Sequence, residues 1–344
     1  MLKIDIFNHI FPVKFYDRML TVAGHLKDMG KRVRQIPMMV DLDERFRVMD
    51  RFDEYCQVLS IASPPLEVMA GPDVTPELAK LANDGMAELV TKYPQRFPAF
   101  TASLPMNNPD AAVAELHRAI KGLGARGVQL FTNVAGKPLD LPEFQPIFDA
   151  MAAYDLPIWL HPARGAEVTD YLSEKRSKYE IWWTLGWPYE TSVAMARLVF
   201  AKLFDRLPGI KIITHHLGGM IPYFEGRVGP GWDLLGSRTS DEDYTLLLKA
   251  LKKRPLDYFR MFYADTAVFG SVSATRCGLD FFGIDKVLFA SDAPFDPERG
   301  PMYIRETIKV LDGLDLSPAN RARIYYKNAQ QLLRLPGSVV AAAE

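Results

Sequence analysis

The sequence predicts an α/β fold, a (β/α)₈ TIM barrel with long loops after its first and sixth strands. Short apolar, β-branched segments alternate with helix-like segments, as in consecutive βαβ units. Several of these segments are apolar throughout, which is typical of parallel strands buried on both faces. Eight strand–helix pairs are the number found in this barrel. The expected strands are Lys3–Phe7, Val58–Ala62, Phe97–Ser103, Gly127–Thr132, Pro157–His161, Lys211–His215, Met261–Thr266 and Val287–Ser291.

Helix-start signals lie between the expected strands. Thr75-Pro76-Glu77 and Asn108-Pro109-Asp110 each combine a potential N-cap, a proline at the first helical position and an early acid. A doubly wound open sheet would show the same alternation, but no Gly-rich phosphate-binding fingerprint follows any strand. The other expected helices are Asp43–Tyr55, Pro142–Tyr154, Tyr189–Leu207, Tyr244–Lys253, Ser271–Phe282, Met302–Leu311 and Pro318–Leu333.

We expect one barrel domain over residues 1–335 and a C-terminal tail at 336–344. Two connections are unusually long, Pro12–Val40 after the first strand and Gly218–Tyr244 after the sixth. Loops of this length inside a compact domain are usually functional, as lids or interfaces.

Composition excludes several classes of partner. The formal net charge is -1, and no run of basic residues resembles a nucleic-acid-binding arm. No apolar run is long enough to span a bilayer, and the opening MLKIDIFNHIFP is too polar for a signal peptide. Cys56 and Cys277 are expected to be free thiols in a reducing compartment, so we expect a cytoplasmic protein without a nucleic-acid or membrane partner.

Histidines and one aspartate gather at the ends of the expected strands. His9 ends the first strand, His161 the fifth, His215-His216 the sixth and Asp292 the eighth. Active sites of such barrels lie at the carboxyl ends of the strands. Imidazoles and a carboxylate that converge there suit a divalent ion, with Zn²⁺ as the first choice and Mn²⁺ as a second.

Five motifs give the chain a resemblance to a known family. They are IDIFNHIFP at Ile4–Pro12, WLHP at Trp159–Pro162, GWPYET at Gly186–Thr191, THHLGGMIPYFEGR at Thr214–Arg227 and LFASDAPF at Leu288–Phe295. In this order the motifs resemble the amidohydrolase-2 branch of the amidohydrolase superfamily, which includes aminocarboxymuconate-semialdehyde and γ-resorcylate decarboxylases. The resemblance implies an amidohydrolase-like barrel.

The resemblance also implies a metal site. In the family, the first strand carries two ligands separated by one residue, and the corresponding positions here are Phe7 and His9. Phe7 departs from the pattern because a phenyl ring cannot ligate. His9, His161 and Asp292 remain as ligands, with an open position for water or substrate. By strand alternation, Asn8 should point away from His9.

The same resemblance assigns catalysis to His216 and Asp292. His216 matches a histidine that acts beside the metal as an acid or base, and the imidazole is suited to proton transfer near neutral pH. His215 is then expected to face the other way and to be structural.

The candidate substrate-binding residues are Arg227, Trp187 and Phe295, which lie in these motifs, together with Arg164 and, as a further candidate, Arg34. Arg227 matches an arginine that reaches a neighbouring subunit's site in some relatives, so a homodimer is expected. Each residue also has a plainer interpretation: Arg227 could form a surface ion pair, and Trp187, like Trp182 and Trp183, could pack a helix on the barrel. Glu190 could orient a ligand or sit at a helix start.

The chain is therefore expected to be an enzyme, a metal-dependent carboxy-lyase that removes CO₂ from an aromatic or unsaturated carboxylic acid. A metal-dependent hydrolase or hydratase of a lactone or conjugated acid is the first alternative, because it would need the same metal geometry. A metal-poor binding protein of the same fold is the second, because Phe7 removes a ligand.

Overall fold

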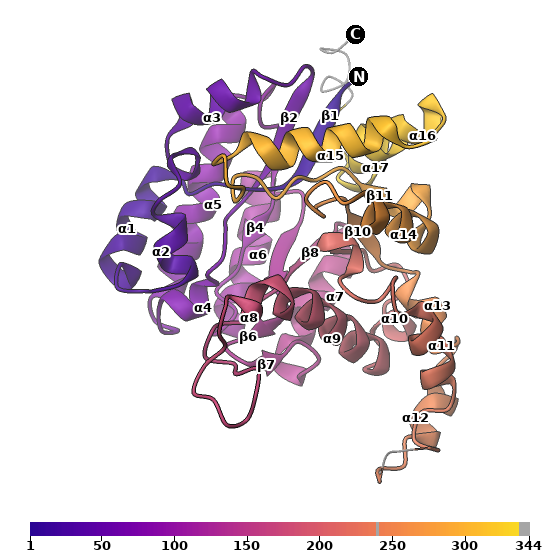
Figure 1. The fold of residues 1–344 in the computed structure, drawn as a ribbon. Helices are drawn as coiled ribbons and strands as arrows, with labels where there is room; N and C mark the ends of the chain where they lie inside the picture. Colours follow the sequence, from indigo (N-terminus) through magenta and orange to yellow (C-terminus); the bar gives the residue numbers. More distant parts are fainter. Residues whose placement is uncertain (239–240, 337–344) are drawn as a thin grey trace.

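Parallel strands form the centre of the molecule, and helices surround them (Figure 1). The computed structural model describes residues 1–238 and 241–336. The strands are β1 Lys3–His9, β2 Tyr55–Ser60, β3 Ala99–Phe100, β4 Ala102–Ser103, β5 Val128–Phe131, β8 Ile158–His161, β9 Ile212–Thr214, β10 Tyr263–Asp265 and β11 Val287–Leu288. A short antiparallel hairpin is made by β6 Asn133–Val134 and β7 Lys137–Pro138.

The strands follow one another in sequence order, as a (β/α)₈ barrel requires. Their hydrogen-bonded orders are β1-β2-β3 and β4-β5-β8-β9-β10-β11, and every pair within them is parallel. Only Thr101 separates β3 from β4. No ladder joins β11 to β1 among the described residues, but the Ile6 amide donates to the Phe289 carbonyl at 3.0 Å and the Asp292 amide to the Phe7 carbonyl at 2.9 Å. The predicted α/β barrel class is confirmed.

The helices pack mainly around the strands. They are α1 Val13–Ala23, α2 Met29–Val33, α3 Leu42–Met49, α4 Leu66–Met69, α5 Thr75–Lys92, α6 Pro109–Leu123, α7 Gln145–Tyr154, α8 Ile181–Thr184, α9 Gly186–Phe200, α10 Leu203–Arg206, α11 Glu225–Asp233, α12 Thr245–Ala250, α13 Pro255–Phe259, α14 Val272–Phe282, α15 Pro301–Gly313, α16 Pro318–Ala322 and α17 Asn328–Leu332. A π-helical turn, Arg323–Lys327, joins α16 to α17. No helix among the described residues is long and apolar enough to cross a membrane.

The two predicted helix starts have different outcomes. Asn108 caps α6, since its side-chain oxygen accepts a hydrogen bond from the Ala111 amide. Thr75 does not cap α5; it is the first residue of that helix, and its hydroxyl donates to Asn107 instead. The predicted N-cap role of Thr75 is therefore wrong, although the helix begins where expected.

Two apolar clusters alternate along the strands. Ile212 belongs to the cluster that also contains the helix side chains, whereas Ile213 belongs to a smaller cluster with Trp159 and Val58. The Trp159 indole N–H donates to the Ile6 carbonyl at 2.9 Å, across to a strand that is not its neighbour. The smaller cluster therefore fills the barrel interior, and Trp159 and Ile213 point into it.

The two long connections contain helices. The first carries α1 and α2, which lie beside the strand ends at the left of Figure 1. The second carries α11, and α12 follows it on an arm that projects from the body at the lower right. The division into one domain at 1–335 and a tail at 336–344 stays a prediction, and residues 337–344 lie outside the described residues.

Candidate metal centre and active site

A β-bulge in β1 sets the direction of its last side chains. Asp5 pairs with Gln57, but Asn8 pairs with Leu59. Between these two pairings β1 advances by three residues and β2 by only two. After this extra residue His9 faces the interior, while the Asn8 side chain turns outward and accepts a hydrogen bond from Arg45 at 3.3 Å. The prediction that Asn8 points away from His9 is confirmed.

Three interior histidines bind a neighbouring oxygen through Nδ1 and turn Nε2 toward one another. His9 Nδ1 lies 3.1 Å from the Ile61 carbonyl, His161 Nδ1 lies 2.6 Å from the Pro162 carbonyl, and His215 Nδ1 lies 2.6 Å from the Asp265 carboxylate. A carbonyl or carboxylate oxygen can only accept, so each Nδ1 carries the proton. Each Nε2 is therefore the ring nitrogen left to face another partner.

These groups converge with Asp292. Ligand atoms of His9, His161 and His215 lie within 4.8 Å of one another, as do those of His215, His216 and Asp292. Asp292 Oδ1 is 3.1 Å from His9 Nε2 and 3.6 Å from His215 Nε2. Four of the strand ends chosen from the sequence thus meet at one point, and the donor set of imidazoles and a carboxylate suits a divalent transition metal.

His215 lies inside the barrel, so the expectation that it faces away is wrong. It has the same strand parity as the interior residue Ile213, and its own backbone is still extended at φ -77° and ψ 154°. The mistake was to count alternation back from His216, which already lies beyond the end of β9 at Thr214.

His216 enters the site from a tight left-handed turn. The backbone has φ 54° at His216, 49° at Leu217, 75° at Gly218 and 62° at Gly219. The two glycines of HHLGG suit this conformation, and a Cβ at Gly219 would stand 2.4 Å from the Pro188 carbonyl oxygen. The turn brings both neighbouring imidazoles to the same side, with their ring centroids 3.7 Å apart.

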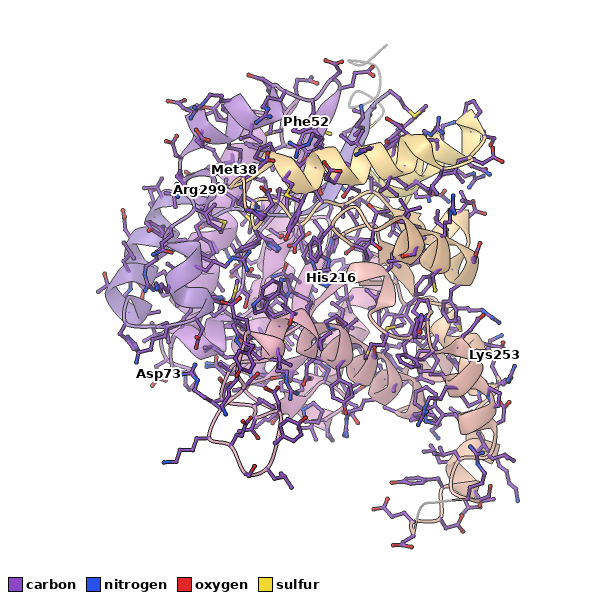
Figure 2. The ribbon with its side chains drawn as sticks, viewed as in Figure 1. Met38, Phe52, Asp73, His216, Lys253 and Arg299 are labelled. Carbon is purple, nitrogen blue, oxygen red and sulfur yellow. The ribbon has the colours of Figure 1, made fainter. Side chains whose placement is uncertain are left out.

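The His216 side chain faces the middle of the molecule (Figure 2). Its Nε2 is 3.6 Å from Asp292 Oδ2, and neither ring nitrogen has a hydrogen-bond partner among the described residues. A buried polar group without a partner is costly, so this imidazole is available for a ligand.

The electrostatics of the cluster keep Asp292 ionised. Burial would raise its pKa, but the neighbouring imidazoles of His215, His216 and His9 hold the pKa well below the usual range. Burial lowers the pKa of His161 and of His216. Burial also opposes charge on His215, yet Asp265 and Asp292 outweigh it and raise the pKa of His215 to about 9. The surroundings of His215 therefore favour a positive charge at Nε2, which a proton supplies without metal and a bound divalent ion would supply by displacing that proton.

A cavity of about 470 Å³ opens above this cluster. It is lined by residues that include His161, His216, Asp292, Trp183, Trp187, Phe269, Phe295 and Tyr303. Of the substrate-binding candidates, Trp187 and Phe295 line it; the Trp187 ring meets His161 edge to face at 5.6 Å, and the Phe295 ring meets His9 at 5.5 Å. The aromatic walls and polar floor would fit a flat, partly apolar molecule.

The arginine in this cavity is one that sequence reasoning missed. Arg32, on α2, is the only lysine or arginine among the lining residues described. Its guanidinium stacks over the rings of Trp183 and Phe295, donates to the Phe295 carbonyl, and forms no ion pair with a described carboxylate. The first long connection was expected to be functional, but nothing in the sequence separates Arg32 from its neighbours.

The three arginines chosen from the sequence lie elsewhere. Arg164 is paired with Glu190 at 2.9 Å beside a second cavity of about 500 Å³. Arg34 donates to the Leu26 carbonyl at 2.9 Å. Arg227 is exposed on α11 and does not line the cavity of its own chain, so its role in a partner's site stays a prediction.

A parallel barrel with histidines and an aspartate at its strand ends defines a class of metal-dependent enzymes. The Amidohydrolase family (Amidohydro_2) matches residues 4–335, and the chain belongs to this family.

Curated relatives of similar length are decarboxylases. Gamma-resorcylate decarboxylase of Polaromonas sp. is 32% identical over 93% of this chain and 95% of its own. The 2-amino-3-carboxymuconate-6-semialdehyde decarboxylase of Dictyostelium discoideum is 28% identical over 97% of this chain and 92% of its own.

Solved structures agree with the fold. The 2,6-dihydroxybenzoate decarboxylase from Rhizobium superposes with a TM-score of 0.78 at 25% identity, over 97% of this chain and 99% of that one. A dihydroxybenzoic acid decarboxylase from Polaromonas sp., with bound manganese and the inhibitor 2-nitroresorcinol, gives a TM-score of 0.76 at 28% identity over 97% of both chains. The sequence-based assignment to this family is confirmed.

Proposed function

We propose that this protein is a metal-dependent decarboxylase that converts an aromatic carboxylic acid into the corresponding arene and CO₂. The observation that carries the proposal is the convergence of four histidines and one aspartate in two overlapping groups, His9-His161-His215 and His215-His216-Asp292, beneath an aromatic-lined cavity. Relatives that act on resorcylate or dihydroxybenzoate support an aromatic acid as the substrate class.

The residues present fit a divalent metal. His9 and His161 have their Nδ1 protons fixed by backbone carbonyls, which leaves Nε2 free to bind, and Asp292 supplies an ionised carboxylate. A bound divalent ion would supply a Lewis acid that holds substrate oxygens and stabilises their negative charge. The donor set is compatible with zinc, our first choice from the sequence, and with manganese, which the Polaromonas structure contains.

Aromatic stacking and Arg32 would hold the substrate. The rings of Trp187 and Phe295 offer faces and edges for an arene, and Arg32 offers a guanidinium that is paired with none of the described carboxylates. A carboxylate or phenolate oxygen of the substrate would complete its charge pairing.

His216 is placed to move the proton that decarboxylation requires. A proton is delivered to the ring carbon that bears the carboxylate, and the bond to the carboxyl carbon then breaks. The electron pair of that bond restores the aromatic ring, and CO₂ leaves. His216 lines the cavity and would hold and deliver the proton, while the ionised Asp292 carboxylate, 3.6 Å from its Nε2, would stabilise the protonated imidazole.

The alternatives are less well supported. A hydrolase or hydratase would use the same cluster, but the relatives and structural neighbours named above are decarboxylases. A metal-poor binding protein is disfavoured by the number of lone pairs that meet at one point without another partner.

The test is a substrate screen with the purified protein. Hydroxybenzoates and muconate-like acids are offered with added Zn²⁺ or Mn²⁺, and CO₂ release is measured together with the ultraviolet spectrum. We expect metal-dependent CO₂ release from at least one hydroxybenzoate and none from His161→Ala. Release of CO₂ that survives in His161→Ala, or hydrolysis of a lactone without CO₂, would overturn the proposal.

We also propose a homodimer and a reducing, cytoplasmic setting. The arm that carries α11 and α12 projects from the body, and Leu234 and Leu246 on it are exposed (Figure 1). Both cysteines are free. Sedimentation should give a dimer, and a monomer at assay concentration would remove the idea that Arg227 completes a partner's site.

A further inference from the structure

Phe7 occupies an interior position, and it is the place where the family resemblance predicts a metal ligand. Its ring centroid lies 5.0 Å from that of His9, 5.4 Å from that of His161 and 3.7 Å from that of His215. A phenyl ring cannot donate a lone pair, so β1 contributes one nitrogen, from His9, instead of two ligands.

His215 offers a lone pair in the same space. Its side chain is fully buried, and its Nε2 has no hydrogen-bond partner among the described residues. That nitrogen lies within 4.8 Å of ligand atoms of both His9 and His161. An unpartnered nitrogen buried this deeply requires a ligand, because its desolvation is otherwise uncompensated.

Asp265 fixes which nitrogen of His215 is free. Its Oδ2 accepts the Nδ1 proton at 2.6 Å, while Oδ1 accepts from the amides of His216 and Ala267 at 3.1 and 3.0 Å. The carboxylate is therefore locked in place by backbone donors. A carboxylate that holds the distal N–H of an imidazole is the usual outer-shell partner of a metal-bound histidine.

We propose that His215 is a protein ligand of the metal, that it replaces the ligand lost at Phe7, and that Asp265 orients it. This inference rests on the proposed metal-dependent function. The Phe7 and His216 rings lie against the His215 ring, each with a centroid distance of 3.7 Å, and they restrict its rotation. Phe7 thus acts as a positioning residue for the histidine that takes over its role.

The first test measures metal affinity without turnover. Chelator-stripped protein is titrated with Co²⁺ and Zn²⁺ against a competing chelator. His215→Ala should weaken binding by more than the ~10–100-fold that loss of an outer-shell partner costs. His216→Ala, the adjacent residue with the same loss of an imidazole, should leave the affinity within a few-fold of the wild type. Unchanged affinity in His215→Ala would overturn the inference.

Asp265→Asn tests the orientation of the ring. The amide oxygen can keep the two backbone donors, but the amide NH₂ would then face His215 Nδ1 and favour the tautomer with its proton on Nε2. That proton would block ligation, and we expect a loss of ~10–100-fold in Co²⁺ affinity. A Co²⁺ affinity equal to that of the wild type would show that Asp265 does not orient His215.

Phe7→Glu tests the exchange between the two strands. Combined with His215→Ala, it returns a carboxylate from β1 to the space beside the other ligands, so metal affinity should recover. Phe7→Leu in the same background fills space without a lone pair and should not restore it. Equal metal affinity of Phe7→Glu/His215→Ala and Phe7→Leu/His215→Ala would contradict the proposal that His215 replaces a ligand lost at Phe7.

A spectrum of the unmutated protein avoids any dependence on variant folding. In the Co²⁺-loaded wild type, each ligating histidine that keeps its Nδ1 proton gives one paramagnetically shifted, exchangeable proton signal. His9, His161 and His215 should give three such signals. Two signals would mean that His215 does not ligate while the proposed function stands. A wild type that binds no metal would refute the proposed function itself.

Discussion

The ends of β1 and β9 lie against each other inside the barrel, and they differ in what they bring to the metal. The end of β1 presents Phe7 and His9, which are one apolar ring and one proposed ligand. The end of β9 presents two imidazoles, of which His215 faces the cluster and His216 also faces the cavity. A ligand missing from one strand can therefore be balanced by an extra imidazole on another, because the strand ends of a barrel share one centre.

His161 on β8 is the reference for this comparison, because it belongs to neither end. His161→Ala removes an imidazole that the metal centre needs whether or not His215 is also a ligand. Metal and turnover should therefore be lost together. This is the largest effect that we expect, with turnover at the background rate. Metal analysis and CO₂ release on the same sample check this prediction. A variant that keeps its full metal content would show that His161 on β8 is not a ligand.

His216→Asn separates the two imidazoles of β9. The metal should remain, since His9, His161 and Asp292 are intact, while turnover should fall by ~10²–10⁴-fold, the usual contribution of a general acid or base. Metal content and turnover are compared with those of His161→Ala. If His216→Asn loses its metal as completely, His216 is a ligand and the proton must come from another group.

Arg32→Leu tests whether the cavity above the two strand ends binds the acid through this guanidinium. Loss of one charge-assisted contact should raise KM by roughly 10–100-fold with a smaller change in kcat. Arg32→Lys keeps the charge but not the planar guanidinium, so its KM should lie between those of the wild type and Arg32→Leu. An unchanged KM in Arg32→Leu would assign substrate anchoring elsewhere, for which Arg227 of a second subunit is the first candidate.

Asp5→Asn tests the part of β1 that precedes the bulge, and its effect is on stability. Burial raises the pKa of Asp5 to about 6, although hydrogen bonds from Ser291 and Tyr55 oppose the shift. The folded chain therefore holds this proton more tightly than the unfolded chain. The associated stability is present below pH ~4 and is lost as the pH rises to ~6, by up to about 3 kcal/mol.

The asparagine variant should lack this pH-dependent loss of stability. Urea unfolding of wild type and variant at a series of pH values measures the difference between their free energies of unfolding. A difference that does not change between pH 4 and pH 7 would show that the Asp5 carboxyl titrates normally.

The sequence was sufficient for the barrel and for the choice of candidate groups at its strand ends. Alternating strand and helix patterns and polar residues at strand ends are local features, so His9, His161 and Asp292 could be found without coordinates. The direction of His215 could not, because it depends on where β9 ends and on the left-handed turn at His216. Arg32 was missed because its position depends on how the first long connection folds back over the strand ends.

The bulge in β1 makes the strand tolerant of losing one residue at a particular place. Ile6 and Phe7 both belong to the interior cluster and share the space opposite Val58. Deleting Phe7 would leave regular pairing with β2, with His9 still opposite Ser60 and still turned inward. In this part of the barrel, a single-codon deletion could therefore remove the ring beside His215 without moving His9 to the other face of the strand.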